Sequence, residues 1–555
     1  MADASNNRRW LWLCLLCLAG SPLSVAGCGP KNYKQDADER VYNFVDSRWE
    51  PEFGPRANYR ITGVPPAPND IDSERIARIE REVSDTGILT IPQAAALATV
   101  HNREYHLQKE LLYTMALDMR LARHAYEMQF FGGGTALYTN DERRGVRQEE
   151  AVVEPNLGFN RLLAFGTLAS VEIGARWVDV LAGSGGSGLS SVFSASVIQP
   201  LLRGSDPRVV REPLTQAERT ALQQIRTVAR FRKQVVVMVL TQYYEALELL
   251  DVVRNTEAYI NSLLTLENRV QKLVDGARLP KEELDQVRQE ILRARDAQIL
   301  AQKEYESFLD LYKMTLGVPP TMEFDLNVWA FEVLKANGIP YPDIALNEAL
   351  EAALCRRLDL TNNADMVIDA QRAVFVAADG LRTGLNVFAG TRLDTDGPKT
   401  TAVGATLDLP LDRVAEQDLY ARAMVLVNQR KREYELTADT IRMEVREAHR
   451  KLLEAAERYN ILSEGLDLAL KRVEHTFSLL EYARVSSRRV LTALEHLYDV
   501  RNEAADALAD YAIATMNFYR DTEILQVRPD GMWETARLPT PMAWNGLALD
   551  TPTPP

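Results

Sequence analysis

Cys28 is the residue whose surroundings point most clearly to a chemical modification. It closes the segment Ser24-Val25-Ala26-Gly27-Cys28, which follows an apolar run from Trp10 to Ala19. That run is too short to cross a bilayer and matches the central part of a secretory signal. Small residues before a cysteine resemble a bacterial lipobox, which predicts cleavage after residue 27 and a lipid on Cys28. An ordinary signal peptide, with Cys28 incidental, is the alternative.

A glycine-rich segment at Gly183–Gly188 has the spacing of a dinucleotide-binding fingerprint, and Asp206 follows at a distance suited to a ribose contact. The fingerprint requires a helix directly afterwards, because the helix N-terminus binds the pyrophosphate. Here a serine-rich alternating segment follows, which favours a hairpin loop. The 6 histidines show no paired metal-ligand spacing, and no nucleophile elbow, P-loop or HExxH motif occurs. We therefore predict no enzymatic activity, no metal site and no cofactor.

The bulk composition excludes further classes of protein. The formal net charge is −14 over 555 residues, without a run of basic residues, which disfavours binding to nucleic acid. Once the signal segment is removed and Cys28 carries lipid, only Cys355 remains, so no intrachain disulfide is available. No later apolar stretch approaches the ~18 residues of a transmembrane helix, so a membrane-spanning part would have to consist of strands.

Two long segments predict helical rods. Residues 213–276 and about 411–482 are almost free of glycine and proline in their interiors, with Gly465 as the exception. At ~1.5 Å per residue, the first rod would be roughly 95 Å long and the second of similar length. Their apolar residues alternate at spacings of four and three, as in coiled coils. A shorter helix is predicted after each rod, at about 284–316 and about 490–524, so each half of the chain should form an antiparallel hairpin.

Segments of alternating polarity predict strands in both halves. Apolar residues occupy every second position of 167–177, 192–198 and 401–409. About ten residues of alternating polarity is the length of a strand that crosses an outer membrane, with apolar side chains toward lipid. A half-buried strand of a soluble sheet has the same pattern. The lipobox upstream favours the membrane.

The two halves of the chain also repeat each other. The segment 91–105 parallels 346–360, and each continues as helix, strand region, long helix and shorter helix. A duplicated unit that cannot bury its own helical seam favours packing around a ring.

Four motifs in consistent order resemble the outer-membrane efflux protein (TolC) family over roughly residues 89–527. The most specific is Gln199-Pro200-Leu201-Leu202-Arg203-Gly204, which resembles the strand-to-helix junction of that family and has a counterpart at Leu409-Pro410-Leu411-Asp412-Arg413. The other three are the segments 89–94, 316–320 and 482–487. Each motif alone is weak, and their order together with the duplication carries the resemblance.

The resemblance implies an α+β membrane protein. Its architecture would be a trimeric duct with a 12-stranded β-barrel, four strands from each subunit, and a long antiparallel coiled-coil α-helical barrel. The implied function is an outer-membrane channel of a tripartite efflux or secretion system. It would pass substrates from an inner-membrane transporter and a periplasmic adaptor (membrane fusion protein) to the exterior, with the helical barrel in the periplasm of a Gram-negative-type cell and Cys28 anchored in outer-membrane lipid.

The predicted organisation has five parts, which account for the whole chain. They are a signal peptide with lipobox (1–27), a lipid-anchored and loosely structured leader (28–85), a first efflux repeat (86–320, strands about 127–202 and helices about 213–316), a second repeat (321–527, strands about 383–410 and helices about 411–525) and a flexible proline-rich tail (528–555).

The second hairpin tip departs from the family pattern. The family commonly has acidic residues just after this tip, whereas the corresponding positions here are Arg489 and Thr492, with Arg488 beside them. The glycine of the tip is replaced by Ala483.

The first tip, which begins at Gly276, looks about three residues longer than is usual in the family. Its acidic residues would either supply the missing negative charge or pair with the arginines to hold the tip shut; they are Glu282, Glu283 and Asp285. The alternative is that these charges only solvate a helix end.

Two other classes of protein stay open. A lipid-anchored periplasmic scaffold or adaptor also has helical hairpins, but adaptors usually carry one hairpin flanked by β domains. Two hairpins with alternating strands in each half favour the duct. A periplasmic hydrolase on a helical scaffold is the third class, and it lacks any catalytic constellation.

Overall fold

The computed structural model describes residues 30–56, 59–61, 73–143, 146–182, 188–337, 339, 345–395, 397–409, 411–528 and 532–535. The signal segment with Cys28, residues 183–187 of the glycine-rich segment, Pro410 and most of the C-terminal tail lie outside the described residues. What the sequence predicts for them stays a prediction.

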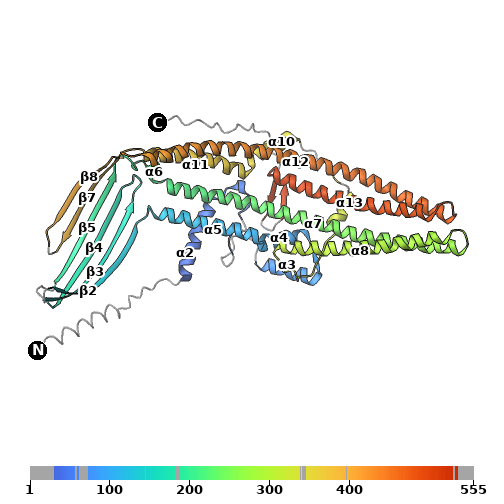
Figure 1. Cartoon of the computed structure of the whole chain (residues 1–555), viewed down its shortest axis with the longest axis horizontal. Coiled ribbons are helices and arrows are strands. Elements are labelled where there is room, and N and C mark those ends of the chain that lie inside the picture. Colours follow the sequence, from blue (N-terminus) through green and yellow to red (C-terminus); the bar gives the residue numbers. More distant parts are fainter. Residues whose placement is uncertain are drawn as a thin grey trace, which may run out of the picture.

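The molecule is long and narrow, with a β-sheet at one end and two helical hairpins that run away from it to the other end (Figure 1). One hairpin consists of α7 (Glu212–Asp275) and α8 (Lys281–Leu316), and the other of α12 (Val414–Glu481) and α13 (Ser487–Asp521). The two long helices contain 64 and 68 residues, which confirms the predicted rods. Among the described helices, none is both long enough and apolar enough to cross a membrane.

Burial within the hairpins follows the coiled-coil spacing. Toward the far end, Leu263 of α7, Val287 of α8, Val473 of α12 and Leu494 of α13 belong to one hydrophobic cluster. The two hairpins therefore pack against each other instead of forming two separate pairs. Alanine recurs along the buried seam of α12, where it lets the neighbouring helices approach closely; the buried alanines include Ala448, Ala455 and Ala469.

Shorter helices precede the strands in each half of the chain. These are α4 (Ile91–His101) and α5 (Arg103–His124) in the first half, and α10 (Leu346–Arg356) and α11 (Leu358–Gly380) in the second. Other short elements are β1 (Ile88–Leu89), α6 (Pro207–Val210), β6 (Asp325–Leu326), which pairs with β1, and α9 (Trp329–Asn337).

Local sequence explains how these helices begin and end. The backbone N–H of Thr90 donates to Gln93 Oε1 at 3.0 Å, which forms the capping box that starts α4. Gly317 ends α8 with a φ of 80°, and a Cβ at this position would lie 2.1 Å from the carbonyl oxygen of His101. Only glycine fits both the backbone conformation and this close approach.

The stretch predicted as a loosely structured leader is largely a packed part of the molecule. It contains α2 (Pro30–Arg48), the 3-10 helix η1 (Pro51–Phe53) and α3 (Ser73–Thr86). Val45 and Tyr59 are buried in the main core, and the carbonyl oxygen of Pro55 accepts a hydrogen bond from buried Arg232 of α7 at 2.9 Å. The prediction is wrong for residues 30–56 and 73–86, because the prolines start a helix or offer a carbonyl instead of loosening the chain.

The tail prediction is also corrected at its start. β9 (Leu525–Val527) pairs antiparallel with β10 (Trp533–Thr535), which lies in the segment predicted to be flexible. The packing of β9 explains this, since Leu525 and Val527 are buried in the main core.

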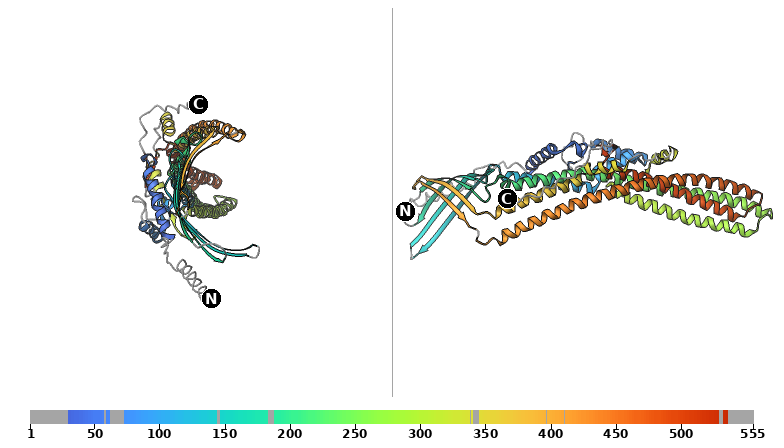
Figure 2. Two further views of the ribbon diagram at one scale, coloured as in Figure 1. Left: turned by 90° about the vertical axis from the view of Figure 1, so that its left-hand side faces the viewer. Right: turned by 90° about the horizontal axis from the view of Figure 1, so that it is seen from above.

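The sheet contains six antiparallel strands in the order β2-β3-β4-β5-β7-β8. Figure 2 shows it as an open arc in the view from the strand end, with α2 on the convex side of the arc. The strands are β2 (Gln129–Arg143), β3 (Val146–Leu162), β4 (Leu168–Ala182), β5 (Gly188–Pro200), β7 (Gly384–Asp394) and β8 (Thr400–Asp408).

The six strands correct the four that the resemblance implied for each subunit. The first half of the chain contributes four strands and the second half two. The predicted strand region of about 127–202 covers β2 and β3, but Gly132–Gly134 and Pro155 are unusual inside strands and interrupt the alternation, so neither strand was predicted individually.

Candidate functional site

The side chains of the sheet separate in large part by polarity onto its two faces. Val171 of β4 pairs with Ala195 of β5, which pairs with Thr391 of β7, and residues paired in register share a face. Ile173 on this face is 59% exposed although it is a large apolar residue. The apolar members of the face include Phe130, Tyr138, Val153, Leu157, Phe159, Val171, Ile173, Trp177, Leu189, Phe193, Val197, Leu385, Val387, Leu393, Val403 and Leu407.

The opposite face carries charged and amide side chains together with some apolar ones, such as Phe131, Leu137 and Ile198. Arg176 Nε lies 2.9 Å from Glu154 Oε1, and Asn156 Nδ2 donates to Glu172 Oε1 at 3.0 Å. Arg392 joins them around a hollow of about 300 Å³. One exposed apolar face and one hydrogen-bonded polar face suit a sheet that separates hydrocarbon from water.

The predicted junction motif forms the turn between β5 and the helices. The hydroxyl of Thr167 donates to Gln199 Oε1, while Gln199 Nε2 donates to the carbonyl oxygen of Phe165 at 3.2 Å. Leu201 N–H donates to the carbonyl oxygen of Leu385 at 2.8 Å, which continues the pairing with β7 beyond Pro200. The hydroxyl of Ser205 donates to the carbonyl oxygen of Leu202 at 2.7 Å and tightens the turn.

The last two residues of the motif, Arg203 and Gly204, bind acidic side chains in the second half of the chain. Arg203 Nη2 lies 2.6 Å from Asp408 Oδ2 at the end of β8. Gly204 has a φ of 74°, and its N–H donates to Asp379 Oδ2 at 2.7 Å. Sequence analysis missed Asp379, although an acidic residue in the last turn of a helix opposes the helix dipole and so indicates a specific partner.

The two hairpin tips have the same backbone geometry. Ala277 and Ala483 have φ values of 53° and 52°, in the left-handed region. The N–H of the following residue, Arg278 or Arg484, donates back to a carbonyl at 2.8 Å or 3.1 Å, which closes each helix with a Schellman motif. Gly276 has a φ of −80° and needs no glycine, so the glycine of the first tip stands one position before the strained residue.

Hydrogen bonds join the two hairpin tips within one chain. The backbone N–H of Ser487, at the start of α13, donates to Glu283 Oε2 at 2.7 Å, and its hydroxyl donates to the same carboxylate. A negative charge is favourable at this position, because the first N–H groups of a helix have no helical acceptor. Arg269 of α7 adds an ion pair to Glu481 at 3.0 Å.

The other predicted tip residues are exposed and do not meet each other. In the described part of one chain, no ion pair joins an acid of the first tip to an arginine of the second; the residues concerned are Glu282, Asp285, Arg488 and Arg489. Within one chain Glu283 is bonded to Ser487 and not to an arginine. Sequence analysis missed Ser487.

Acidic side chains gather between α7 and α13, about midway along the molecule. Burial, followed by the charges of Asp506 and Asp510, raises the pKa of Glu248 to about 7. Burial and then Asp510 also raise the pKa of Glu245. Arg458 of α12 compensates in part, since it lies 2.8 Å from Asp506 Oδ2 and 3.0 Å from Asp510 Oδ2.

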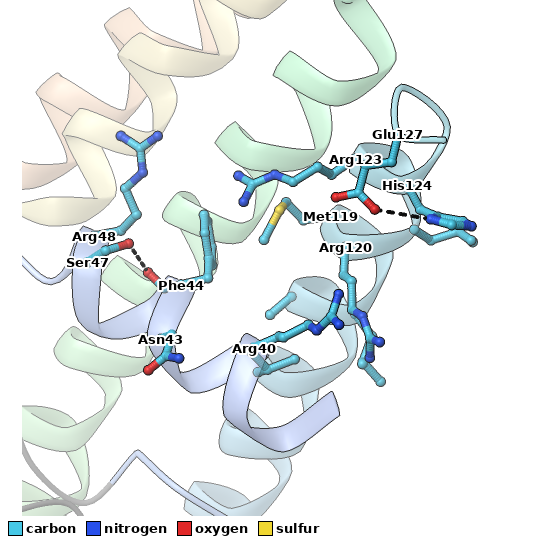
Figure 3. A pocket seen from close by; sticks show the side chains of 14 residues that line it. Arg40, Asn43, Phe44, Ser47, Arg48, Met119, Arg120, Arg123, His124 and Glu127 are labelled. Carbon is cyan, nitrogen blue, oxygen red and sulfur yellow. Dashed lines mark hydrogen bonds and ion pairs between the residues drawn. The ribbon is translucent and has the colours of Figure 1, made fainter. Parts of the chain in front are cut away.

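A groove of about 1010 Å³ lies between α2 and α5 and is lined by basic side chains (Figure 3). Each arginine is already paired with a carboxylate of the same chain. The pairs are Arg40–Asp36 at 3.0 Å, Arg120–Asp36 at 2.9 Å, Arg123–Glu218 at 2.8 Å and Arg48–Glu218 at 3.9 Å. The groove therefore offers little free positive charge to an anion.

No protein-family model matches this chain, and no curated protein matches it. Solved structures do match, among them VceC, an outer membrane protein of Vibrio cholerae, with a TM-score of 0.58 and 11% identity over 78% of this chain and 95% of that one. The CmeC outer membrane channel of Campylobacter jejuni gives 0.57 and 12% over 84% and 90%, and the MtrE outer membrane channel of Neisseria gonorrhoeae, in its open state, gives 0.55 and 11% over 83% and 96%. This chain has the TolC-like fold.

The TolC-like fold accounts for the arrangement described above. The long hairpins, the shorter helices beside them and the antiparallel sheet at one end form one architecture that the predicted resemblance anticipated. The hairpin β2–β3 is the main departure from the expected four strands.

Proposed function

We propose that this chain is the channel subunit of a tripartite efflux or secretion system and acts as a homotrimer in the outer membrane. The observation that carries the proposal is the sheet, with exposed apolar side chains on one face and ion pairs on the other. The apolar face meets lipid, and the polar face lines a water-filled lumen. We propose neither a cofactor nor enzymatic activity for it.

The anchor and the strand lengths support this location. A lipid on Cys28, after removal of residues 1–27, holds the chain at the outer membrane. β2 to β5 contain 13 to 17 residues each. At ~3.3 Å per residue and a tilt of ~40°, such strands cross the ~25 Å apolar band of an outer membrane.

Exposed apolar residues on α12 support an assembly of several copies. Leu436, Met443, Ile461 and Leu468 are exposed in the single chain and recur along one side of the helix. A neighbouring copy covers this stripe, so that the hairpins of three copies form the α-helical barrel in the periplasm. The tips then meet a periplasmic adaptor, which connects the channel to an inner-membrane transporter.

The test is single-channel conductance of the purified mature trimer in a planar bilayer. We expect discrete current steps, small if the tips rest closed. Absence of steps in every variant of a correctly folded trimer would contradict the channel and favour a lipid-anchored scaffold.

The arginines of the second tip provide the second part of the test. We expect the double variant Arg488→Ala, Arg489→Ala to raise basal conductance, because it removes exposed charge from the narrow end of the duct. Arg295→Ala, at an exposed arginine of α8 away from the tips, is the matched control. Unchanged conductance in the double variant would rule out a gate role for these arginines.

The lipid on Cys28 is tested separately. Intact mass of the purified protein should exceed that of residues 28–555 by a diacylglycerol and an acyl group, and Cys28→Ala should abolish the increase. A mature protein that begins elsewhere and carries no lipid would contradict the anchor.

A further inference from the structure

We infer that three copies of this chain close a barrel of eighteen strands, six from each copy, with β2 of one copy paired to β8 of the next. The hairpin β2–β3 is then part of the barrel wall. The inference rests on the homotrimer of the proposed function and extends it to the partner edge and the width of the pore.

Comparison of the two halves identifies β2–β3 as the additional hairpin. In the second half, α11 ends at Gly380 and β7 begins at Gly384. In the first half, α5 ends at His124, whereas β4 begins only at Leu168. The strand pairs β4–β5 and β7–β8 both lead into a long helix, so they correspond, and β2–β3 fills the extra interval.

Continuous pairing makes the additional hairpin part of the same sheet. β2 pairs with β3 from Gln129↔Asn160 to Arg143↔Val146. β3 pairs with β4 from Leu162↔Leu168 to Glu149↔Ala182, with an interruption at Glu154 and Pro155 that keeps the register and a register shift between Glu149 and Glu150. A hairpin that folded over the mouth of a barrel or into its lumen would not remain bonded to β4 along its whole length.

The polarity of the hairpin also continues that of the sheet. Leu157 of β3 is 69% exposed and pairs in register with Ile173 of β4, on the apolar face. Phe130 of β2 pairs with Phe159, and their ring centroids are 6.1 Å apart on the same face. On the polar face, Glu154 of β3 binds Arg176 of β4. Apart from Phe131 and Leu137 of β2, which are apolar residues on the polar face, the added strands therefore have the same lipid-facing and water-facing sides as the others.

The two edge strands of the sheet, β2 and β8, determine which strands pair between neighbouring copies. β2 and β8 each have one pairing strand in the described sheet, which leaves a row of backbone groups unpaired on each edge. Unpaired backbone groups are not tolerated in hydrocarbon, so both edges require a strand. In a ring of copies whose helices all point the same way, only unlike edges meet. β8 then runs antiparallel to the neighbouring β2, like every other pair in this sheet.

The number of strands sets the width of the pore. With a strand spacing of ~4.8 Å and a tilt of ~40°, eighteen strands give a wall-to-wall diameter of ~36 Å, against ~24 Å for twelve. The membrane-embedded part is then about one and a half times as wide as that of a twelve-stranded barrel, so the hairpin tips and not the barrel set the narrowest point.

Cysteine cross-linking in the lipidated, membrane-embedded protein tests the seam, that is, the pairing of β2 of one copy with β8 of the next. In a chain with Cys355→Ala, cysteine at Ala136 of β2 is combined in turn with cysteine at Thr401, Val403 or Ala405 of β8, all on the apolar face. Oxidation should convert the chains to covalent dimers and trimers for at least one combination. The matched control places cysteine at Ala175 of β4, on the same face, where the edge of a twelve-stranded barrel would lie.

The outcomes distinguish a wrong number of copies from a wrong pair of edge strands between copies. Native mass spectrometry of the unoxidised protein gives the number of copies, and a number other than three contradicts the proposed function itself. In a trimer, cross-links from Ala175 with none from Ala136 would place β4 at the seam and overturn the inference. A trimer without either cross-link would overturn it as well, because β2 and β8 would then not be neighbours.

Spin labels give a second readout that does not depend on the seam. Labels at Leu157 and at Ile173, its register neighbour, should both collide more with oxygen than with a water-soluble nickel complex. A label at Asn156, on the polar face, should show the reverse. Contact with water at Leu157 but with lipid at Ile173 would place the hairpin outside the membrane wall and overturn the inference.

Discussion

The two long helices have similar lengths but very different surroundings. α7 is buried on several sides, and its buried residues include charged ones, namely Arg226, Arg232, Lys233 and Asp251. α12 is buried along one stripe, whose members are apolar apart from Thr476. α7 is thus the centre of the single chain, whereas α12 keeps a free side.

The ion pairs show the same difference. Lys233 of α7 lies 3.1 Å from Glu523, and the two side chains are 2% and 4% exposed. Arg458 of α12 pairs with Asp506 and Asp510 at the surface. Buried pairs fix one arrangement because breaking them leaves an uncompensated charge, while exposed pairs contribute little. α7 therefore organises the fold of one chain, whereas α12 has an exposed side that a neighbouring copy can cover.

The largest expected effect is at the buried pair of α7. Lys233→Met should lower the free energy of unfolding by about 3–5 kcal/mol, because it leaves the carboxylate of Glu523 buried without a partner. Adding Glu523→Gln should recover most of this loss. The matched change on α12, Arg458→Met, should cost no more than ~1 kcal/mol. Guanidinium unfolding in detergent, followed by circular dichroism, measures all three, and equal losses for Lys233→Met and Arg458→Met would show that burial does not distinguish the two ion pairs.

A second pair of variants separates the two sides of α12. Leu452 is 2% exposed and Leu436 is 67% exposed in the single chain. Leu452→Ala should cost about 2–4 kcal/mol of chain stability through the cavity it leaves. Leu436→Ala should leave the chain stable but lower the temperature at which trimers dissociate on a native gel. If Leu436→Ala left the trimer unaffected, the free side of α12 would not be a subunit contact.

The acidic residues between α7 and α13 predict a dependence on pH. The pKa of Glu248 is raised from 4.5 to about 7, so the folded chain holds this proton more tightly than the unfolded chain. Its contribution to stability is therefore fully present below pH 4.5 and is lost as the pH rises through about 7.

Replacement of this carboxyl tests the effect. Glu248→Gln should raise stability at pH 8 by ~1–2 kcal/mol, after allowance for partial exposure, and leave it nearly unchanged at pH 4. Unfolding midpoints at both pH values provide the measurement. A variant that kept the full pH dependence of the parent would show that another group is responsible.

The smallest expected effects are at the tips, where the two hairpins are most alike. Ala277→Gly and Ala483→Gly should each stabilise their tip by ~1 kcal/mol, because glycine adopts a left-handed backbone without the clash of a Cβ. Gly276→Ala, at a φ of −80°, should have little effect. Hydrogen exchange of the tip amides should slow in the first two variants only. A destabilisation by Ala277→Gly would show that this φ does not exist in solution.

The sequence predicted those parts of the fold that depend on local periodicity. The four-and-three spacing of α12 and the alternation in β4 are visible within one element, so both were found. The hairpin β2–β3 lies inside the predicted strand region, but its glycines and Pro155 conceal the alternation, so its two strands were not predicted individually. α2 was missed because prolines flank it.

In the candidate site, too, local motifs were predictable from the sequence and their distant partners were not. Gln199–Gly204 was found as a motif, but Asp379, which accepts from Gly204, lies 175 residues away in the chain. Glu283 was found as an acid near a tip, whereas its partner Ser487 is 204 residues distant. Partners of this kind are set by tertiary packing, which no local pattern encodes.

The position of Arg232 has a consequence for the order of folding. Its guanidinium donates to the carbonyl oxygens of Pro55 and Val527, so one buried side chain joins the beginning, the middle and the end of the chain. Under the proposed export, with the N-terminus first, the chain cannot complete this contact until its last segment has crossed the inner membrane. Contacts of such high sequence separation form slowly. The hairpins can assemble early from local contacts, and folding then finishes at the centre of the molecule, where both ends of the chain meet α7.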